Sequence, residues 1–148
     1  MRPARVAPAL LIALNATVGL GCGTAGSSPT DTPAAPHSET LKPVFSEALP
    51  NVPGKTFTSA IVTLPPAARA LPHRHGDAFV YAYVLEGVVS SQLEGAPAQQ
   101  YHQGQSWSEP PGAHHVATEN TSATDEAKLL VVFVATTGDQ LKVEDPQS

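Results

Sequence analysis

Short apolar runs, each closed by glycine, proline or another turn residue, are the feature that most limits how this 148-residue chain can fold. Two examples are residues 79–86 (FVYAYVLE) and 128–135 (KLLVVFVA). Runs of about four to eight residues that are rich in β-branched and aromatic side chains are typical of β-strands. The chain contains 15 prolines and 11 glycines, which supply turns at close intervals and disfavour long helices. From residue 41 onward the sequence therefore predicts an all-β domain.

The expected strands follow one another closely. They are residues 56–64, 79–86, 88–93, 99–102, 106–109, 115–118, 128–135 and 140–143. Seven or more short strands at this spacing indicate a sandwich or a barrel. We expect 79–86 and 88–93 to be neighbours in a meander, and 128–135 to be a core strand whose last partner is 140–143. No internal repeat is long enough for a second domain.

The N-terminal residues have the composition of an export signal. Arg2 and Arg5 precede an apolar run from residue 6 to 20, followed by small residues, and this order is typical of a secretory signal peptide. The run is too short for a comfortable transmembrane helix. The stretch 19–22 (GLGC) resembles the lipobox of bacterial lipoproteins, although its leucine lies one place late. We therefore expect a signal peptide over 1–21 and lipidation of Cys22, with a conventionally cleaved secreted protein and an uncleaved N-terminus as the alternatives.

Residues 22–40 are rich in Gly, Ser, Thr, Pro and Ala, so they cannot bury a core and are expected to form a flexible linker to the domain at 41–148. This organisation predicts a protein exported to the bacterial periplasm or cell surface, held to the membrane only by the lipid on Cys22. The net charge is −5 and no basic patch is visible, so nucleic acid is excluded as a partner.

Three histidines suggest a metal site. His73 and His75 lie one residue apart, so on a strand they face the same way about 7 Å apart and can aim two imidazoles at one point. A third imidazole can come from the run 110–115 (PPGAHH), where alternation lets only His114 or His115 point inward. Imidazole is the commonest ligand for divalent transition metals. The alternative for His73 and His75 is a pair of surface histidines in a turn after Pro72.

These residues resemble the two motifs of the cupin superfamily. The first motif, Gly-x5-His-x-His-x3–4-Glu-x6-Gly, corresponds to residues 67–87, with His73, His75 and Gly87 in place. The second, Gly-x5-Pro-x-Gly-x2-His-x3-Asn, begins at Gly104 and places its histidine at His115. The resemblance implies a small jelly-roll barrel, also called a double-stranded β-helix, over most of residues 41–140. It also implies a metal bound inside the barrel by these three histidines, with Fe(II), Mn, Ni, Cu or Zn as candidates.

The sequence departs from the motifs at four places. Ala67 replaces the first glycine, Asn120 lies one place late, and Phe79 and Val80 stand where the family has its glutamate ligand. The site that the resemblance carries over therefore has three histidines and no motif carboxylate. Three-histidine centres occur in some cupin dioxygenases.

Glu109 can replace the missing carboxylate, because it precedes the second-motif turn on a strand expected to line the barrel. Its alternative is a strand-end carboxylate that faces water. Trp107, Tyr81 and Tyr83 are candidates to line the cavity or to pack in the core.

Three functions follow. The first is a metal-dependent enzyme that oxidises a small chelating molecule, such as a diketone, phenol or thiol, with O2. The second is a non-enzymatic module that binds a small molecule or a metal, and the third is a barrel that has lost its metal. The resemblance also implies a possible homodimer.

Overall fold

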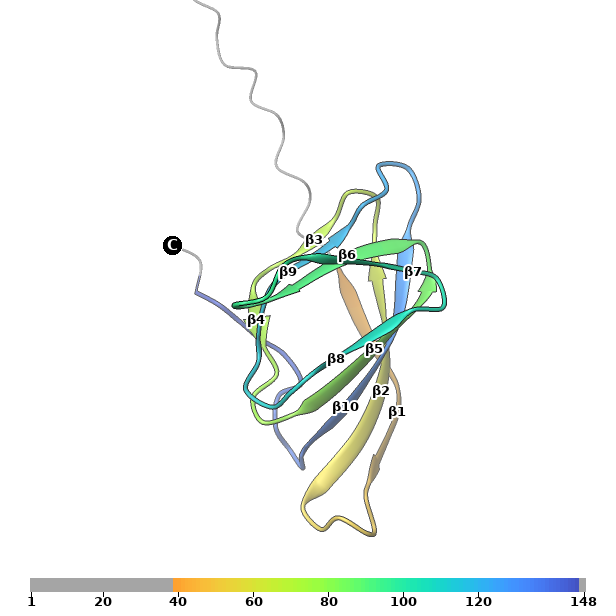
Figure 1. The fold of residues 1–148 in the computed structure, drawn as a ribbon. Coiled ribbons are helices and arrows are strands. Elements are labelled where there is room, and N and C mark those ends of the chain that lie inside the picture. The colour runs from red at the N-terminus through yellow and green to blue at the C-terminus, as the bar shows by residue number, and fades with distance from the viewer. Residues whose placement is uncertain (1–38, 147–148) are drawn as a thin grey trace, which may run out of the picture. The chain divides into compact units, whose positions relative to one another are not determined.

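The structure, a computed structural model, describes residues 39–146. The expected signal peptide (1–21), Cys22 and the linker up to residue 38 lie outside the described residues. The described part is built from eleven strands and contains no helix (Figure 1). The strands are β1 (Thr40–Ala48), β2 (Lys55–Leu64), β3 (Arg69–Ala70), β4 (His73–Arg74), β5 (Phe79–Glu86), β6 (Val88–Leu93), β7 (Gln99–His102), β8 (Ser106–Glu109), β9 (His114–Asn120), β10 (Ala127–Thr136) and β11 (Val143–Glu144). Between residues 39 and 146 there is accordingly no helix that could cross a membrane.

The strands form two antiparallel sheets, which face each other as a jelly-roll barrel (Figure 1). One sheet has the order β1-β2-β10-β5-β8 and is called sheet A here. The other, sheet B, has the order β11-β4-β9-β6-β7, with β3 also paired to β9. The expected all-β jelly-roll fold is confirmed.

Two expected strand pairings are wrong. β5 lies between β10 and β8 in sheet A, whereas β6 lies between β9 and β7 in sheet B, so the two are not neighbours. The chain passes from one sheet to the other at Gly87, which has φ +80° and packs closely against Ala127. β10 pairs with β2 and β5 and not with 140–143. The turn after β10 instead leads the chain to the opposite sheet, where β11 pairs with β4.

Three strands were not expected: β1, β3 and β4. β1 is almost wholly exposed and contains Pro43, next to which its register with β2 shifts. An edge strand tolerates proline and buries little, so it lacks the alternating apolar pattern that identifies a strand in a sequence. β3 and β4 have two residues each, which is too short for any periodicity.

The two sheets present chemically different inner faces. The inner face of sheet A is apolar because β2, β5 and β10 alternate, and β10 buries every second side chain. Its buried members include Ala60, Val62, Leu64, Val80, Ala82, Val84, Leu129, Val131 and Phe133. The inner face of sheet B contains buried polar side chains, namely His73, His115, Ser91, Thr118 and Asn120. A polar cluster thus faces an apolar wall, which is the setting of the site described below.

Candidate metal centre

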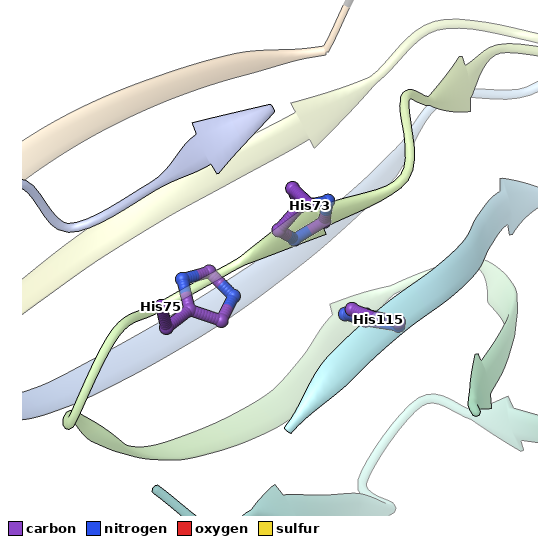
Figure 2. A group of neighbouring side chains, drawn as sticks. All are labelled: His73, His75 and His115. Carbon is purple, nitrogen blue, oxygen red and sulfur yellow. The ribbon is translucent and has the colours of Figure 1, made fainter. Parts of the chain in front are cut away.

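The three expected histidines meet inside the barrel. His73 on β4 pairs directly with His115 on β9, and His75 follows at the end of β4. All three are nearly inaccessible to solvent, with exposures of 6%, 3% and 9% respectively. One nitrogen from each ring lies within 4.8 Å of the other two. Figure 2 shows His73 and His75 on one segment, with His115 facing them from the neighbouring strand.

Backbone carbonyls set the tautomers of His73 and His75. Nδ1 of His73 lies 2.7 Å from the carbonyl oxygen of Leu71, and Nδ1 of His75 is bonded to the carbonyl of Leu141. A carbonyl can only accept, so both Nδ1 atoms must donate a proton. Each Nε2 is then left with a free lone pair, which is the form of imidazole that binds a metal.

Burial keeps these two rings neutral. It lowers the pKa of His73 from 6.5 to about 4, against the opposing effect of the bond to Leu71, while His115, His75 and Lys142 lower it further. Burial likewise lowers the pKa of His75, opposed by its bond to Leu141 and by the nearby carboxylate of Glu109. Both rings are therefore unprotonated at neutral pH and do not need to lose a proton before they bind a cation.

His115 is held by two hydroxyls from the same sheet. Its Nε2 lies 2.8 Å from Oγ of Ser91 and 2.8 Å from Oγ1 of Thr118. Its Nδ1 lies 3.1 Å from Oε1 of Glu109. With Nε2 occupied by the hydroxyls, Nδ1 is the nitrogen that faces the carboxylate. Ser91 and Thr118 were not among the expected site residues. Ser91 occupies an inward position of the alternating strand β6, whereas Thr118 lies three residues after His115, beyond an irregularity in the pairing of β9 with β6, so alternation from His115 does not mark it.

His114 points away from the site. Its Nε2 lies 2.7 Å from Oδ2 of Asp145, near the C-terminal end of the described chain. Its Nδ1 lies 3.5 Å from Oε1 of Glu94. Strand alternation thus places His115 inside the barrel and His114 in a contact between β9 and the segment after β11.

Glu109 brings a carboxylate to the three histidines. It is 3% exposed, and its Oε1 accepts a hydrogen bond of 3.1 Å from Nε1 of Trp107. Its Oε2 lies 3.6 Å from Nε2 of His75, and among residues 39–146 this oxygen has no hydrogen-bond partner although it is buried. The water-facing alternative for Glu109 therefore does not describe this structure.

The environment of Glu109 favours its ionised form. Burial raises the pKa of this carboxyl, but the hydrogen bond with His115, the electrostatic effect of the nearby His115 and His75 rings and the bond from Trp107 outweigh burial and lower it overall. A buried carboxylate with one oxygen lacking a partner is costly unless another group meets it. That oxygen is the position at which a cation or a ligand proton would be accommodated.

A cavity of about 50 Å³ adjoins the histidines. Its walls combine the inner face of sheet A with Trp107, Glu109 and Thr118. Of the three aromatic candidates, Trp107 lines this cavity, whereas Tyr81 is 37% exposed on the outer side of β5. Two further charged residues, Glu39 and Lys142, line the cavity as well. No motif or strand pattern marked either of them in the sequence.

Comparisons with known proteins agree with this fold. A family model described as the cupin domain matches residues 60–133, which is half of the chain. A Klebsiella pneumoniae protein with a double-stranded β-helix domain superposes with a TM-score of 0.59 at 11% identity, over 77% of this chain and 92% of that chain. The Cnp3 cupin domain of Schizosaccharomyces pombe gives a TM-score of 0.56 at 14% identity, over 67% and 62%.

A third similar structure is the DMSP lyase DddQ of Ruegeria pomeroyi DSS-3, with a TM-score of 0.53 at 22% identity, over 60% of this chain and 42% of that chain. The chain thus spans less than two thirds of the Cnp3 domain and of this lyase. At these identities the three structures show a shared fold alone. No match was found among curated proteins.

Proposed function

The chain belongs to the cupin family, and from this we propose that its barrel binds one divalent transition metal through His73, His75 and His115 and acts there on a small molecule. The observation that carries the proposal is the convergence of three buried imidazole nitrogens within 4.8 Å. Two of these rings have the tautomer and the neutral charge that metal binding requires. Candidate ions are Fe(II), Mn, Ni, Cu and Zn.

The distances around Glu109 support its inclusion in this centre. Two ligands that share one metal at about 2.1 Å lie roughly 3.0 to 3.4 Å apart. The carboxylate oxygens of Glu109 lie 3.1 Å from Nδ1 of His115 and 3.6 Å from Nε2 of His75. The first separation lies within this range and the second exceeds it by about 0.2 Å, so a small shift lets one cation contact all three groups and also satisfy the buried Oε2 that has no partner within residues 39–146. The three histidine nitrogens are spread more widely, so the rings must approach by about an ångström to share a metal.

The chemistry that we propose is oxidation of a small chelating molecule by O2. A divalent metal supplies Lewis acidity and open positions for small ligands. The protein supplies three neutral nitrogen donors, an apolar wall from sheet A that limits bulk water, and a carboxylate beside the cavity.

Metal analysis of protein purified without a polyhistidine tag tests this proposal. We expect one divalent transition metal per chain, and loss of that metal in the double variant His73→Ala/His75→Ala and in His115→Ala. His102→Ala is the matched control, because His102 is an exposed histidine on β7. Equal metal content in all variants would refute the centre. A screen for O2 consumption on the loaded protein then separates an oxidising enzyme from a module that binds without turnover.

We also propose that the chain is exported and anchored through a lipid on Cys22. The support is the order of charges, apolar run and small residues in 1–22. Labelling with a radioactive fatty acid should mark the full chain and fail to mark Cys22→Ser. Equal labelling of both would refute the anchor, and recovery of the protein in the cytoplasmic fraction would refute export. The expected homodimer stays a prediction, tested by the mass of the protein in solution.

A further inference from the structure

The cavity beside the histidines contains an ion pair that the proposed metal centre does not use. Lys142 contacts the carboxylate of Glu39, and both residues line the cavity. Their side chains are only 17% and 12% exposed. The same ammonium also lies 2.9 Å from Oε1 of Glu144, whose side chain is 50% exposed. Lys142 therefore has one carboxylate partner at the cavity and one that is largely in water.

An ion pair between Lys142 and Glu39 is unusual in a cavity whose walls are mostly apolar. Lysine and glutamate are seldom buried unless they are paired, because removing a charge from water is costly. The other walls of the cavity are mostly apolar side chains of sheet A, such as Leu41, Val62 and Leu129. A pair that served only to tie residue 39 to the C-terminal segment would be as effective at the surface and would avoid that cost.

The backbone fixes the position of Lys142 relative to the histidines. The preceding residue, Leu141, accepts the hydrogen bond from Nδ1 of His75 through its carbonyl. The Leu141 side chain also packs against the hydrophobic core. The segment that orients one ring of the centre thus also brings the Lys142 side chain to the same cavity.

We infer that Lys142 binds the carboxylate of a small ligand whose other end reaches the three-histidine centre, and that Glu39 occupies this carboxylate position when no ligand is bound. The inference rests on the proposed function, because the second end of the ligand needs the metal. The side chain of Glu39 is the evidence for the chemical class, since it is a carboxylate that the cavity already accepts beside Lys142. The mostly apolar walls of this small cavity favour a short molecule with an apolar middle.

The competing explanation is that the pair is only a structural tie. The two explanations predict different effects of Glu39→Gln on ligand affinity. If Glu39 competes with the ligand, Glu39→Gln removes the competitor and strengthens ligand binding. If the pair is a tie, the same change weakens the local structure and leaves ligand binding unchanged or weaker. Glu144→Gln is the matched control, because it removes the exposed partner of the same ammonium.

Trp107 provides the readout, because it is the single tryptophan of the chain and lines the cavity. The full chain is loaded with Zn²⁺, its metal content is measured, and its fluorescence is titrated with succinate and glutarate. Propionate and butyrate, which lack the second carboxylate, are titrated in parallel. We expect the dicarboxylates to bind about tenfold or more tightly than their monocarboxylate counterparts, as for one charge-assisted contact.

Four variants then test whether Lys142 and Glu39 cause the preference for dicarboxylates. Lys142→Met should abolish it, Lys142→Arg should retain part of it, Glu39→Gln should strengthen dicarboxylate binding, and Glu144→Gln should leave it unchanged. If Lys142→Met does not fold, Lys142→Arg and Glu39→Gln still decide the question. A Zn²⁺-loaded protein with no preference for dicarboxylates, or one in which Glu39→Gln leaves dicarboxylate binding unchanged or weakens it, would overturn the proposed roles of Lys142 and Glu39. Failure of the wild-type chain to hold Zn²⁺ or any of the other candidate ions would instead refute the proposed metal centre.

Discussion

Glu109 lies directly opposite Val80 in the antiparallel ladder between β5 and β8. Val80 occupies one of the two positions, 79 and 80, at which the cupin motif can have its glutamate, and its side chain is fully buried. Paired residues on neighbouring strands project to the same face of a sheet, with Cβ atoms about 5 Å apart. A carboxylate is therefore present on the strand adjacent to β5, on the same face of the sheet as Val80.

This pairing predicts that a carboxylate at residue 80 on β5 can take over the role of the carboxylate of Glu109 on β8. Glu109→Val should weaken Zn²⁺ binding by about 10- to 100-fold, the usual cost of losing a group that supports a metal. Adding Val80→Glu to that variant should restore part of the affinity, because the new carboxylate enters from the opposite residue. Competition with a chelator of known affinity measures both effects. If Glu109→Val binds Zn²⁺ as the wild type does, the carboxylate has no part in the centre.

The hydroxyls of Ser91 and Thr118, which contact the His115 ring, should affect metal affinity without contacting the metal. Ser91→Ala combined with Thr118→Val removes both groups near Nε2 of His115, so the ring loses its orientation. We expect Zn²⁺ affinity to fall by about tenfold or more. Leaving a buried nitrogen without a partner should also cost about 1–3 kcal/mol of stability, measured by urea denaturation. Ser108→Ala, at an exposed position of β8, is the control and should change neither quantity.

The metal-free protein should lose stability between pH 7.5 and pH 5. The pKa of His73 is about 4 in the folded chain and 6.5 in the unfolded chain, so within this range the unfolded state binds more protons. Stability therefore falls as pH drops through 6.5, and His73 alone accounts for roughly 2 kcal/mol at pH 5. His75 acts in the same direction, because burial lowers its pKa too.

Urea denaturation of chelator-treated protein at several pH values measures the slope of unfolding free energy against pH. His73→Gln should flatten it, because the group that takes up a proton on unfolding has been removed. His102→Gln, at an exposed histidine, should leave the slope unchanged. A wild-type stability that is constant across this range would contradict the neutral, buried state of His73.

The crossing between the two sheets at Gly87 should tolerate no side chain. A Cβ at this residue would lie 3.0 Å from Cβ of Ala127, and the backbone has φ +80°. Gly87→Ala should therefore combine backbone strain with overpacking and cost about 3 kcal/mol of stability. Gly54→Ala is the matched control, because Gly54 has φ +81° and no described atom lies within 4 Å of its would-be Cβ. The control should cost about 1 kcal/mol, and equal losses in both variants would exclude the clash with Ala127.

Strand positions were predictable where the signals are local. The bounds 79–86, 88–93, 99–102 and 106–109 are those of β5, β6, β7 and β8, because Gly87, Gly95, Gly104 and Pro110 end each run. Pairing was less predictable. The expected meander between 79–86 and 88–93 was wrong, because nothing in two adjacent apolar runs says that the chain changes sheets at Gly87.

The features of the candidate site likewise fall into those that local sequence predicts and those that it does not. The spacing of His73, His75 and His115, together with strand alternation, was enough to expect that three imidazoles meet, since the period of a strand is a local property. That Glu109 stands opposite Val80, and that Glu39 and Lys142 share the cavity, depends on which segments lie side by side. Residues 39 and 142 are far apart in the chain, so no local pattern could relate them. The sequence by itself determined the longer barrel strands from residue 56 onward and the inward histidines, because strand period and turn residues are local signals. Only tertiary packing decided the sheet order, the short and edge strands, the place of Glu109 opposite Val80 and the charges around the cavity.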